Sequence, residues 1–211
     1  MVKFNVVNPF AAFLQKELNL TQDQKEIVSY GLQVLIYSLI GVGSILVAGW
    51  LLGCFWTTLT VMVSTGCLRV VSGGAHSKTP LTCGILGVFL GPSLGKMAAL
   101  CGEMLSPSAL LMLITVGFLV SLYTVSRFAP VDSPAKPISS VEKRGKLRFV
   151  SVAVLCSITA VQILLFYTVV KAPQIVLAAS LGVWWQAFTL TGVGHRFVTF
   201  LDDLKERRWT G

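Results

Sequence analysis

A run of 42 residues, positions 27–68, contains no Asp, Glu, Lys, Arg or His, and it constrains the fold most strongly. A single helix of that length would reach about 63 Å, twice the ~30 Å thickness of a bilayer's hydrocarbon core. The run therefore predicts two membrane-spanning helices joined by a tight turn. We expect the turn between Gly49 and Gly53, with Trp50 at the level of the lipid headgroups.

Four further charge-free runs follow, at residues 79–95, 104–126, 149–170 and 172–195. Only 12% of the chain is charged, against about 25% in soluble globular domains, which excludes that class. The fold class is therefore all-α: an integral membrane protein with a compact bundle of about six hydrophobic helices. Gly87, Gly91, Pro92 and Gly95 interrupt the third run, so a short or re-entrant third helix is the alternative to a full crossing.

The two ends of the chain carry amphipathic patterns. Residues 1–26 place Phe10, Phe13 and Leu14 on one helical face. Residues 196–211 form a basic tail with a similar pattern, in which Asp202 and Asp203 fall on the polar face. Thr21 and Gln24 resemble a capping box at the start of the first span. We expect one membrane domain, 1–211, with its transmembrane bundle at 27–195. Each end is interpreted as a surface helix on the bilayer or as a solvated terminus.

The distribution of basic residues predicts the orientation. With the N-terminus in the cytoplasm, all 17 Lys and Arg residues except Lys96 and Lys171 fall in cytoplasmic segments. This predicts a multi-pass protein whose two termini are cytoplasmic. Anionic lipid headgroups explain the net charge of +8. A nucleic-acid partner is not expected, because no basic patch is interleaved with base-stacking aromatic residues.

One predicted cytoplasmic loop concentrates reactive side chains in an otherwise apolar chain. Residues 69–83 include Arg69, the pair Gly73-Gly74, His76 and Cys83. Pro80 favours a new helix, with Cys83 near its positive end, where a thiolate is stabilised. The two glycines let the loop bring His76 within hydrogen-bonding distance, which would make a nucleophile with its general base.

Less reactive roles are also open for these residue types. A loop histidine can cap a helix or contact a headgroup, and a cysteine in an apolar run is often inert. We interpret Cys54, Cys67, Cys101 and Cys156 in that way. The spacing favours neither a disulfide framework nor a metal site, so we expect no metal and no cofactor.

The motifs together resemble a known family. The run Arg69, Gly73, Gly74, Ala75, His76 and Cys83 is followed, two spans later, by Ala129-Pro130-Val131-Asp132 and Lys136-Pro137-Ile138. This order is similar to that of the accessory gene regulator protein B family, the membrane-embedded cysteine endopeptidases of Gram-positive quorum sensing. The resemblance covers most of the chain.

The resemblance implies a thiol protease in the bacterial cytoplasmic membrane, with its active site on the cytoplasmic side. It would cleave the C-terminal part of a short amphipathic precursor peptide with an acidic tail, and would promote thiolactone or lactone cyclisation of an autoinducing peptide. Cys83 would be the nucleophile and His76 its base, with no third group unless Asp132 folds nearby. The resemblance also suggests a homodimer.

Supporting roles follow for other residues. Gly73 and Gly74 match the family's glycines and could help to hold an oxyanion. Arg69 matches a loop arginine that could orient the loop, receive an acidic part of the precursor or contact a headgroup. The basic residues that could attract the acidic tail are Lys143, Arg144, Lys146 and Arg148. The alternative function is a small transporter or peptide exporter without proteolytic chemistry.

Overall fold

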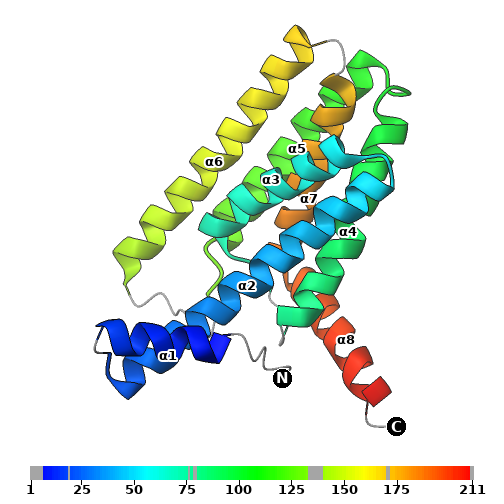
Figure 1. Cartoon of the computed structure of the whole chain (residues 1–211). Coiled ribbons are helices and arrows are strands. Elements are labelled where there is room, and N and C mark those ends of the chain that lie inside the picture. Colours follow the sequence, from blue (N-terminus) through cyan, green and yellow to red (C-terminus); the bar gives the residue numbers. More distant parts are fainter. Residues whose placement is uncertain are drawn as a thin grey trace. The chain divides into compact units, whose positions relative to one another are not determined.

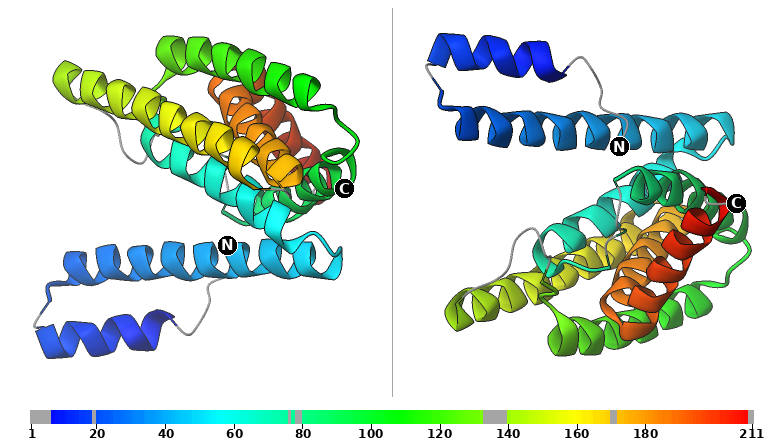
Figure 2. Two further views of the ribbon diagram at one scale, coloured as in Figure 1. Left: turned by 90° about the horizontal axis from the view of Figure 1, so that it is seen from above. Right: turned by 90° about the horizontal axis from the view of Figure 1, so that it is seen from below.

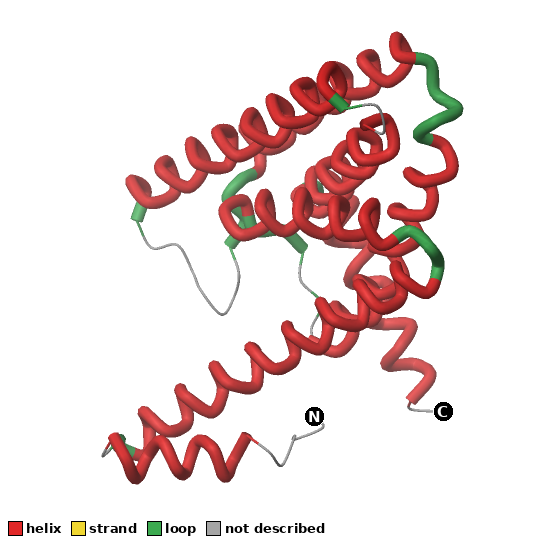
Figure 3. Tube along the Cα trace, turned by 45° about the horizontal axis from the view of Figure 1, so that its top comes forward, coloured by secondary structure: helices red, strands yellow, loops and turns green. Residues whose placement is uncertain are grey.

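The computed structural model describes residues 7–18, 20–75, 77, 80–132, 140–169 and 172–209, which form helices and no strand (Figure 3). In chain order (Figure 1), the helices are α1 (Val7–Leu18), α2 (Gln22–Leu51), α3 (Phe55–Ser72), α4 (Pro80–Cys101), α5 (Pro107–Phe128), α6 (Val141–Thr168), α7 (Ala172–Leu190) and α8 (Gly192–Trp209). The chain forms two compact units, Met1–Ser44 and Ile45–Gly211, and the boundary between them falls inside α2.

The turn predicted within the 42-residue run is confirmed. Helix α2 ends at Leu51 and α3 begins at Phe55. The N–H of Gly53 donates to the Trp50 carbonyl at 2.9 Å, and the N–H of Cys54 donates to the Gly49 carbonyl at 2.8 Å. Gly53 has a φ of 67°, a conformation that glycine adopts without the steric penalty of a side chain.

The helices support a multi-pass membrane protein. Within the described part of the chain, four helices are long and apolar enough to cross a bilayer: α2, α4 from Thr82 onward, α5 and α6. A fifth crossing results if α7 and α8, which meet at 85°, count as one bent span. All six predicted apolar runs are helical, but α3, with four threonines and Arg69 in 18 residues, is not among these candidate spans.

The third apolar run differs from the short or re-entrant alternative. Helix α4 is continuous over 22 residues, with Pro92 inside it. Its glycines permit close helix packing instead of a break. A Cβ atom at Gly91 would lie 3.0 Å from the Ile45 side chain, and one at Gly95 would overlap Thr58.

Helix α7 forms the core of the second unit. Figure 2 shows α7 (orange) between α3 (cyan) and α5 (green). One apolar cluster centres on Val176 and Leu181, and a second includes Val183 and Leu190. Helix α7 also carries polar side chains into this core. Ser180, Gln186 and Thr189 are all at most 3% exposed.

Both predicted end helices are present. In the first unit, the capping box is confirmed, because the Thr21 N–H donates to Gln24 Oε1 at 2.9 Å and the Gln24 N–H donates to Thr21 Oγ1 at 3.3 Å. In the second unit, α8 begins at Gly192, four residues before the predicted tail. Its Asp202, predicted on the polar surface face, is buried.

Candidate functional site

The predicted site residues flank the loop between α3 and α4. Arg69 is in the last turn of α3, Gly73 and Gly74 follow that helix, and Cys83 is in the first turn of α4. The start of α4 at Pro80 agrees with the helix predicted there, so Cys83 lies near its positive end. The Cys83 side chain is exposed. His76 lies outside the described residues.

Arg69 joins the loop to α7. Its Nη2 donates a hydrogen bond to the Ala75 carbonyl at 2.5 Å, and its Nη1 donates to Gln186 Oε1 at 3.4 Å. A planar guanidinium can serve two acceptors in this way from a single position. Arg69 therefore links the end of α3 to Ala75 of the loop and to α7.

Gln186 organises the polar contacts beneath the loop. This side chain is fully buried. Its Nε2 donates to Ser72 Oγ at 3.0 Å and to the Gly73 carbonyl at 2.6 Å, while its Oε1 accepts from Thr189 Oγ1 at 3.2 Å as well as from Arg69. Sequence reasoning did not assign Gln186 to the site. A glutamine within an apolar run was the available signal, because such a side chain must find partners in the bundle interior.

The two loop glycines are required by backbone geometry. Gly73 has a φ of 68° and Gly74 a φ of 145°. A Cβ atom at Gly73 would lie 2.5 Å from the Val131 carbonyl oxygen, and one at Gly74 would lie 2.8 Å from Thr189 Oγ1. The Gly73 N–H donates to the Arg69 carbonyl at 2.9 Å. In this conformation it is therefore not free for the expected oxyanion role.

The Ala129–Asp132 motif lies against the same loop. The Val131 N–H donates to the Ser72 carbonyl at 3.0 Å, and Ala129 is fully buried. Asp132 forms an ion pair with Arg144 at 2.5 Å, so the described contact of Asp132 is with the basic stretch. The two sequence motifs, with 45 residues of chain between them, thus pack against each other.

The basic stretch has contacts within the protein. Arg148 Nε donates to the Ala129 carbonyl at 2.9 Å, and Lys146 pairs with Glu142 one helical turn away at 2.6 Å. Lys143 is exposed at the start of α6. Arg144 and Arg148 therefore join the start of α6 to the residues that directly follow α5, whereas Lys143 and Lys146 are exposed.

Charge links the two ends of the loop. Burial lowers the pKa of the Arg69 guanidinium, and an electrostatic interaction with Cys83 acts in the opposite direction. Arg69 lies outside the candidate membrane spans. Arginine keeps its proton in proteins, so the site holds a cation whose field reaches the Cys83 sulfur.

A further contact reaches the loop from α8. Ser77 Oγ donates to Asp202 Oδ1 at 2.5 Å. Sequence reasoning placed Asp202 on a solvated face, because the amphipathic pattern of the tail does not reveal the bend before α8. That bend turns the buried face of α8 toward the loop.

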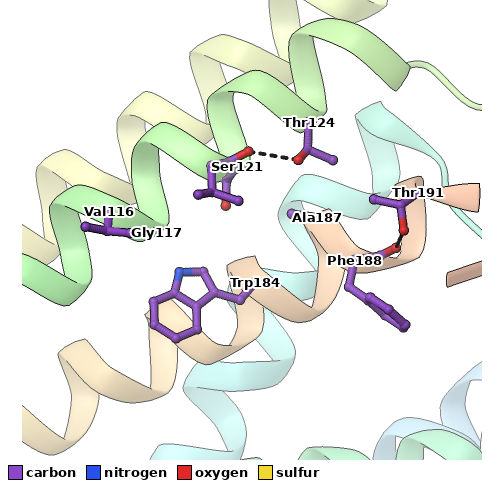
Figure 4. Close-up of a pocket in the computed structure, with 9 residues that line it drawn as sticks. Val116, Gly117, Ser121, Thr124, Trp184, Ala187, Phe188 and Thr191 are labelled. Carbon is purple, nitrogen blue, oxygen red and sulfur yellow. Dashed lines mark hydrogen bonds between the residues drawn. The ribbon is translucent and has the colours of Figure 1, made fainter. Parts of the chain in front are cut away.

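A cavity of about 400 Å³ lies between α5 and α7 (Figure 4). Trp184 extends from α7 toward Gly117 and Ser121 of α5. The lining of the cavity is mostly apolar and includes no residue of the loop between α3 and α4. In the described ranges, no group of three or more His, Cys, Asp or Glu side chains is arranged to hold a metal ion.

Comparison with known protein families places the whole site, from Arg69 to Gln186, within one match. A sequence model of accessory gene regulator B matches residues 7–190. The chain belongs to the accessory gene regulator B family. No solved structure gives a significant match.

Two relatives of the family are similar over nearly their whole length. "Putative AgrB-like protein 2" of Clostridium perfringens (strain 13 / Type A) is 28% identical over 211 residues, which covers 96% of this chain and 98% of the relative. "Putative AgrB-like protein" of Clostridium perfringens (strain SM101 / Type A) is 29% identical over 204 residues, or 92% and 94% of the two chains. Membership of the accessory gene regulator B family supports a role in processing quorum-sensing peptides.

Proposed function

We propose that the protein is a membrane cysteine endopeptidase that cleaves a short precursor peptide and closes its N-terminal part into a thiolactone or lactone ring. Cys83 is the nucleophile and His76 its general base and then acid. One observation carries the proposal: Cys83 is exposed on the first turn of α4, and Arg69, at the other end of the same loop, donates a hydrogen bond to the carbonyl of Ala75, the residue before His76. Thiolates near a helix N-terminus and a cation are the reactive form of cysteine.

The first step forms a thioester. The Cys83 thiolate attacks a backbone carbonyl carbon of the precursor, and an S–C bond forms. The C–N bond then breaks, and His76 gives the departing amine the proton that it took from the thiol. The C-terminal fragment leaves, and the N-terminal part stays bound to Cys83.

The second step closes the ring. A Cys or Ser side chain of the bound peptide loses its proton to His76 and attacks the thioester carbon, and the bond to Cys83 breaks. The thiolate is regenerated, so the cycle consumes no cofactor. Proximity favours this intramolecular attack over hydrolysis, and Cys83 lies at the edge of a candidate span, where water is scarcer than in the cytosol.

The proposed orientation places the site at the cytoplasmic face. The basic start of α6 would then lie on the same side as the loop, because Val131 and Ser72 join the two. The outward-facing Lys143 and Lys146 would attract the acidic tail of the precursor. The partner proposed for the site is thus a short peptide with an amphipathic N-terminal part.

Co-expression with a tagged precursor in the native membrane tests the proposal. Cys83→Ala should abolish release of the C-terminal fragment, and Cys83→Ser should trap or slow an ester-linked intermediate that mass spectrometry detects. Cys67→Ala is the matched control, since Cys67 is also exposed but lies within α3. Fragment release by Cys83→Ala would exclude the protease function.

The same variants test the transporter alternative. Movement of a peptide across the membrane that persists in Cys83→Ala, with no cleavage by the unmodified protein, would favour transport. Loss of cleavage in both Cys83→Ala and His76→Ala, with Cys67→Ala active, would favour the dyad.

A further inference from the structure

The contact between Ser77 and Asp202 joins two segments that are 125 residues apart in the chain. Ser77 is in the loop between α3 and α4, immediately after His76. Asp202 is on α8 and is only 5% exposed. A buried carboxylate requires hydrogen-bond donors to offset its lost hydration, and the Ser77 hydroxyl is such a donor.

The bend before α8 brings Asp202 to the loop. Helices α7 and α8 meet at 85°, and Thr191 caps α8 through a hydrogen bond from the Gly194 N–H to Oγ1 at 3.1 Å. Phe197 of α8 packs edge-on against Trp185 and Phe188 of α7. Val198 and Asp202, one turn apart, are buried on α8. Helix α8 is therefore docked on α7 and presents its carboxylate from a fixed position.

The residues on both sides of His76 are thus held by different helices. Before it, the Ala75 N–H donates to the Thr189 carbonyl of α7 at 2.9 Å, and the Ala75 carbonyl accepts from Arg69. After it, Ser77 is held by Asp202 of α8. Ala75 and Ser77, the two sequence neighbours of His76, are therefore anchored separately, one to α3 and α7 and the other to α8.

We propose that Asp202 is a positioning residue, which acts through Ser77 to hold the loop segment that carries the general base. This inference rests on the proposed function, since it assigns Asp202 to the reaction of Cys83 and His76. The family match ends at residue 190, so α8 lies beyond the part of the chain that the match covers. Through the contact between Asp202 and Ser77, α8 helps to hold the loop that carries His76 in the sequence.

A double-mutant cycle in membranes tests the coupling of the two residues. Asp202→Ala and Ser77→Ala should each slow single-turnover release of the C-terminal fragment by about tenfold or more, because each removes a hydrogen bond to a charged group. The double variant should be no slower than the slower single variant. Glu103→Ala is the control: it removes a carboxylate from an exposed position beyond the opposite end of α4 and should leave the rate unchanged.

Conservative variants separate positioning from a general structural effect. Ser77→Thr keeps the hydroxyl and Asp202→Asn keeps an oxygen acceptor, so both should retain more activity than the alanine variants. The loss should appear in kcat with KM little changed. The rate of Cys83 alkylation by iodoacetamide and the unfolding temperature in detergent should stay near those of the unmodified protein for Ser77→Ala.

The outcomes distinguish this inference from the proposed function. Unchanged cleavage in Asp202→Ala and Ser77→Ala, with Cys83→Ala inactive, would overturn the positioning role and leave the endopeptidase intact. Additive effects of the two substitutions would also overturn it. Cleavage by Cys83→Ala would instead overturn the proposed function itself.

Discussion

Gln186 Nε2 donates a hydrogen bond to the Gly73 carbonyl oxygen at 2.6 Å, across 113 residues of sequence. The same amide group also contacts Ser72 and Arg69. A fully buried side chain of α7 therefore fixes the end of α3 and the start of the loop together. Such a network favours one arrangement of the helices, because a buried polar group without a hydrogen-bond partner would cost free energy.

Gln186→Leu should reduce both stability and cleavage. Leucine fits an apolar helix but leaves the Gly73 carbonyl and one Arg69 N–H without this partner, at a cost of about 1–3 kcal/mol for each buried group. We expect a lower unfolding temperature in detergent and at least a tenfold slower release of the C-terminal fragment.

Gln162→Leu provides the control for that experiment. Gln162 is also buried, and its Nε2 donates to Ser180 Oγ at 2.9 Å, away from the loop. It should lose stability while retaining cleavage per folded molecule. Equal loss of activity in both variants would contradict a specific role for Gln186.

Gly73→Ala should inactivate the protein more strongly than its small size suggests. Its φ of 68° disfavours any side chain, and the added Cβ would approach the Val131 carbonyl to 2.5 Å. Gly66→Ala in α3 is the control: its Cβ meets nothing within 4 Å, so it should stabilise the helix by about 0.5–1 kcal/mol. The unfolding temperature should therefore fall for Gly73→Ala and rise for Gly66→Ala. Cleavage should be lost only in Gly73→Ala.

The fold was largely predictable from charge-free runs and turn residues. The runs located the helices because exclusion of charge is the dominant constraint in a bilayer. The glycines of α4 were misleading as evidence for a break, since a glycine in a membrane helix signals a close neighbour as readily as a bend. Here Gly91 and Gly95 make room for Ile45 and Thr58.

The loop residues of the site were also predictable, but their partners were not. Arg69, Gly73 and Cys83 are visible as polar or conformationally free residues in one short segment. Gln186 and Asp202 come from α7 and α8, and only the three-dimensional arrangement brings them to the loop. Local patterns report which face of a helix is apolar, not which distant backbone that face meets.

Arg69→Lys should reduce cleavage even though lysine keeps the positive charge. Arg69 reaches two acceptors at once, the Ala75 carbonyl and Gln186 Oε1, whereas the compact ammonium of lysine cannot match this forked geometry. We expect cleavage to fall by about tenfold or more, measured as single-turnover release of the C-terminal fragment. If charge alone were needed, Arg69→Lys would be active and Arg69→Gln inactive.

The basic start of α6 allows substrate attraction to be separated from structural support. Lys143→Gln and Lys146→Gln remove exposed charges, and the Lys146–Glu142 pair, with both side chains more than 70% exposed, is worth only about 0.3–0.5 kcal/mol. These variants should therefore keep the unfolding temperature but raise KM for a precursor with an acidic tail. The increase should shrink at high salt, which screens exposed charges, and disappear with a neutral tail. Arg148→Gln should instead lower the unfolding temperature, because it removes the hydrogen bond from Arg148 Nε to the carbonyl of Ala129 at the end of α5. If the KM of these variants depended on neither salt concentration nor tail charge, the two lysines would not bind the precursor and would contact only the membrane surface.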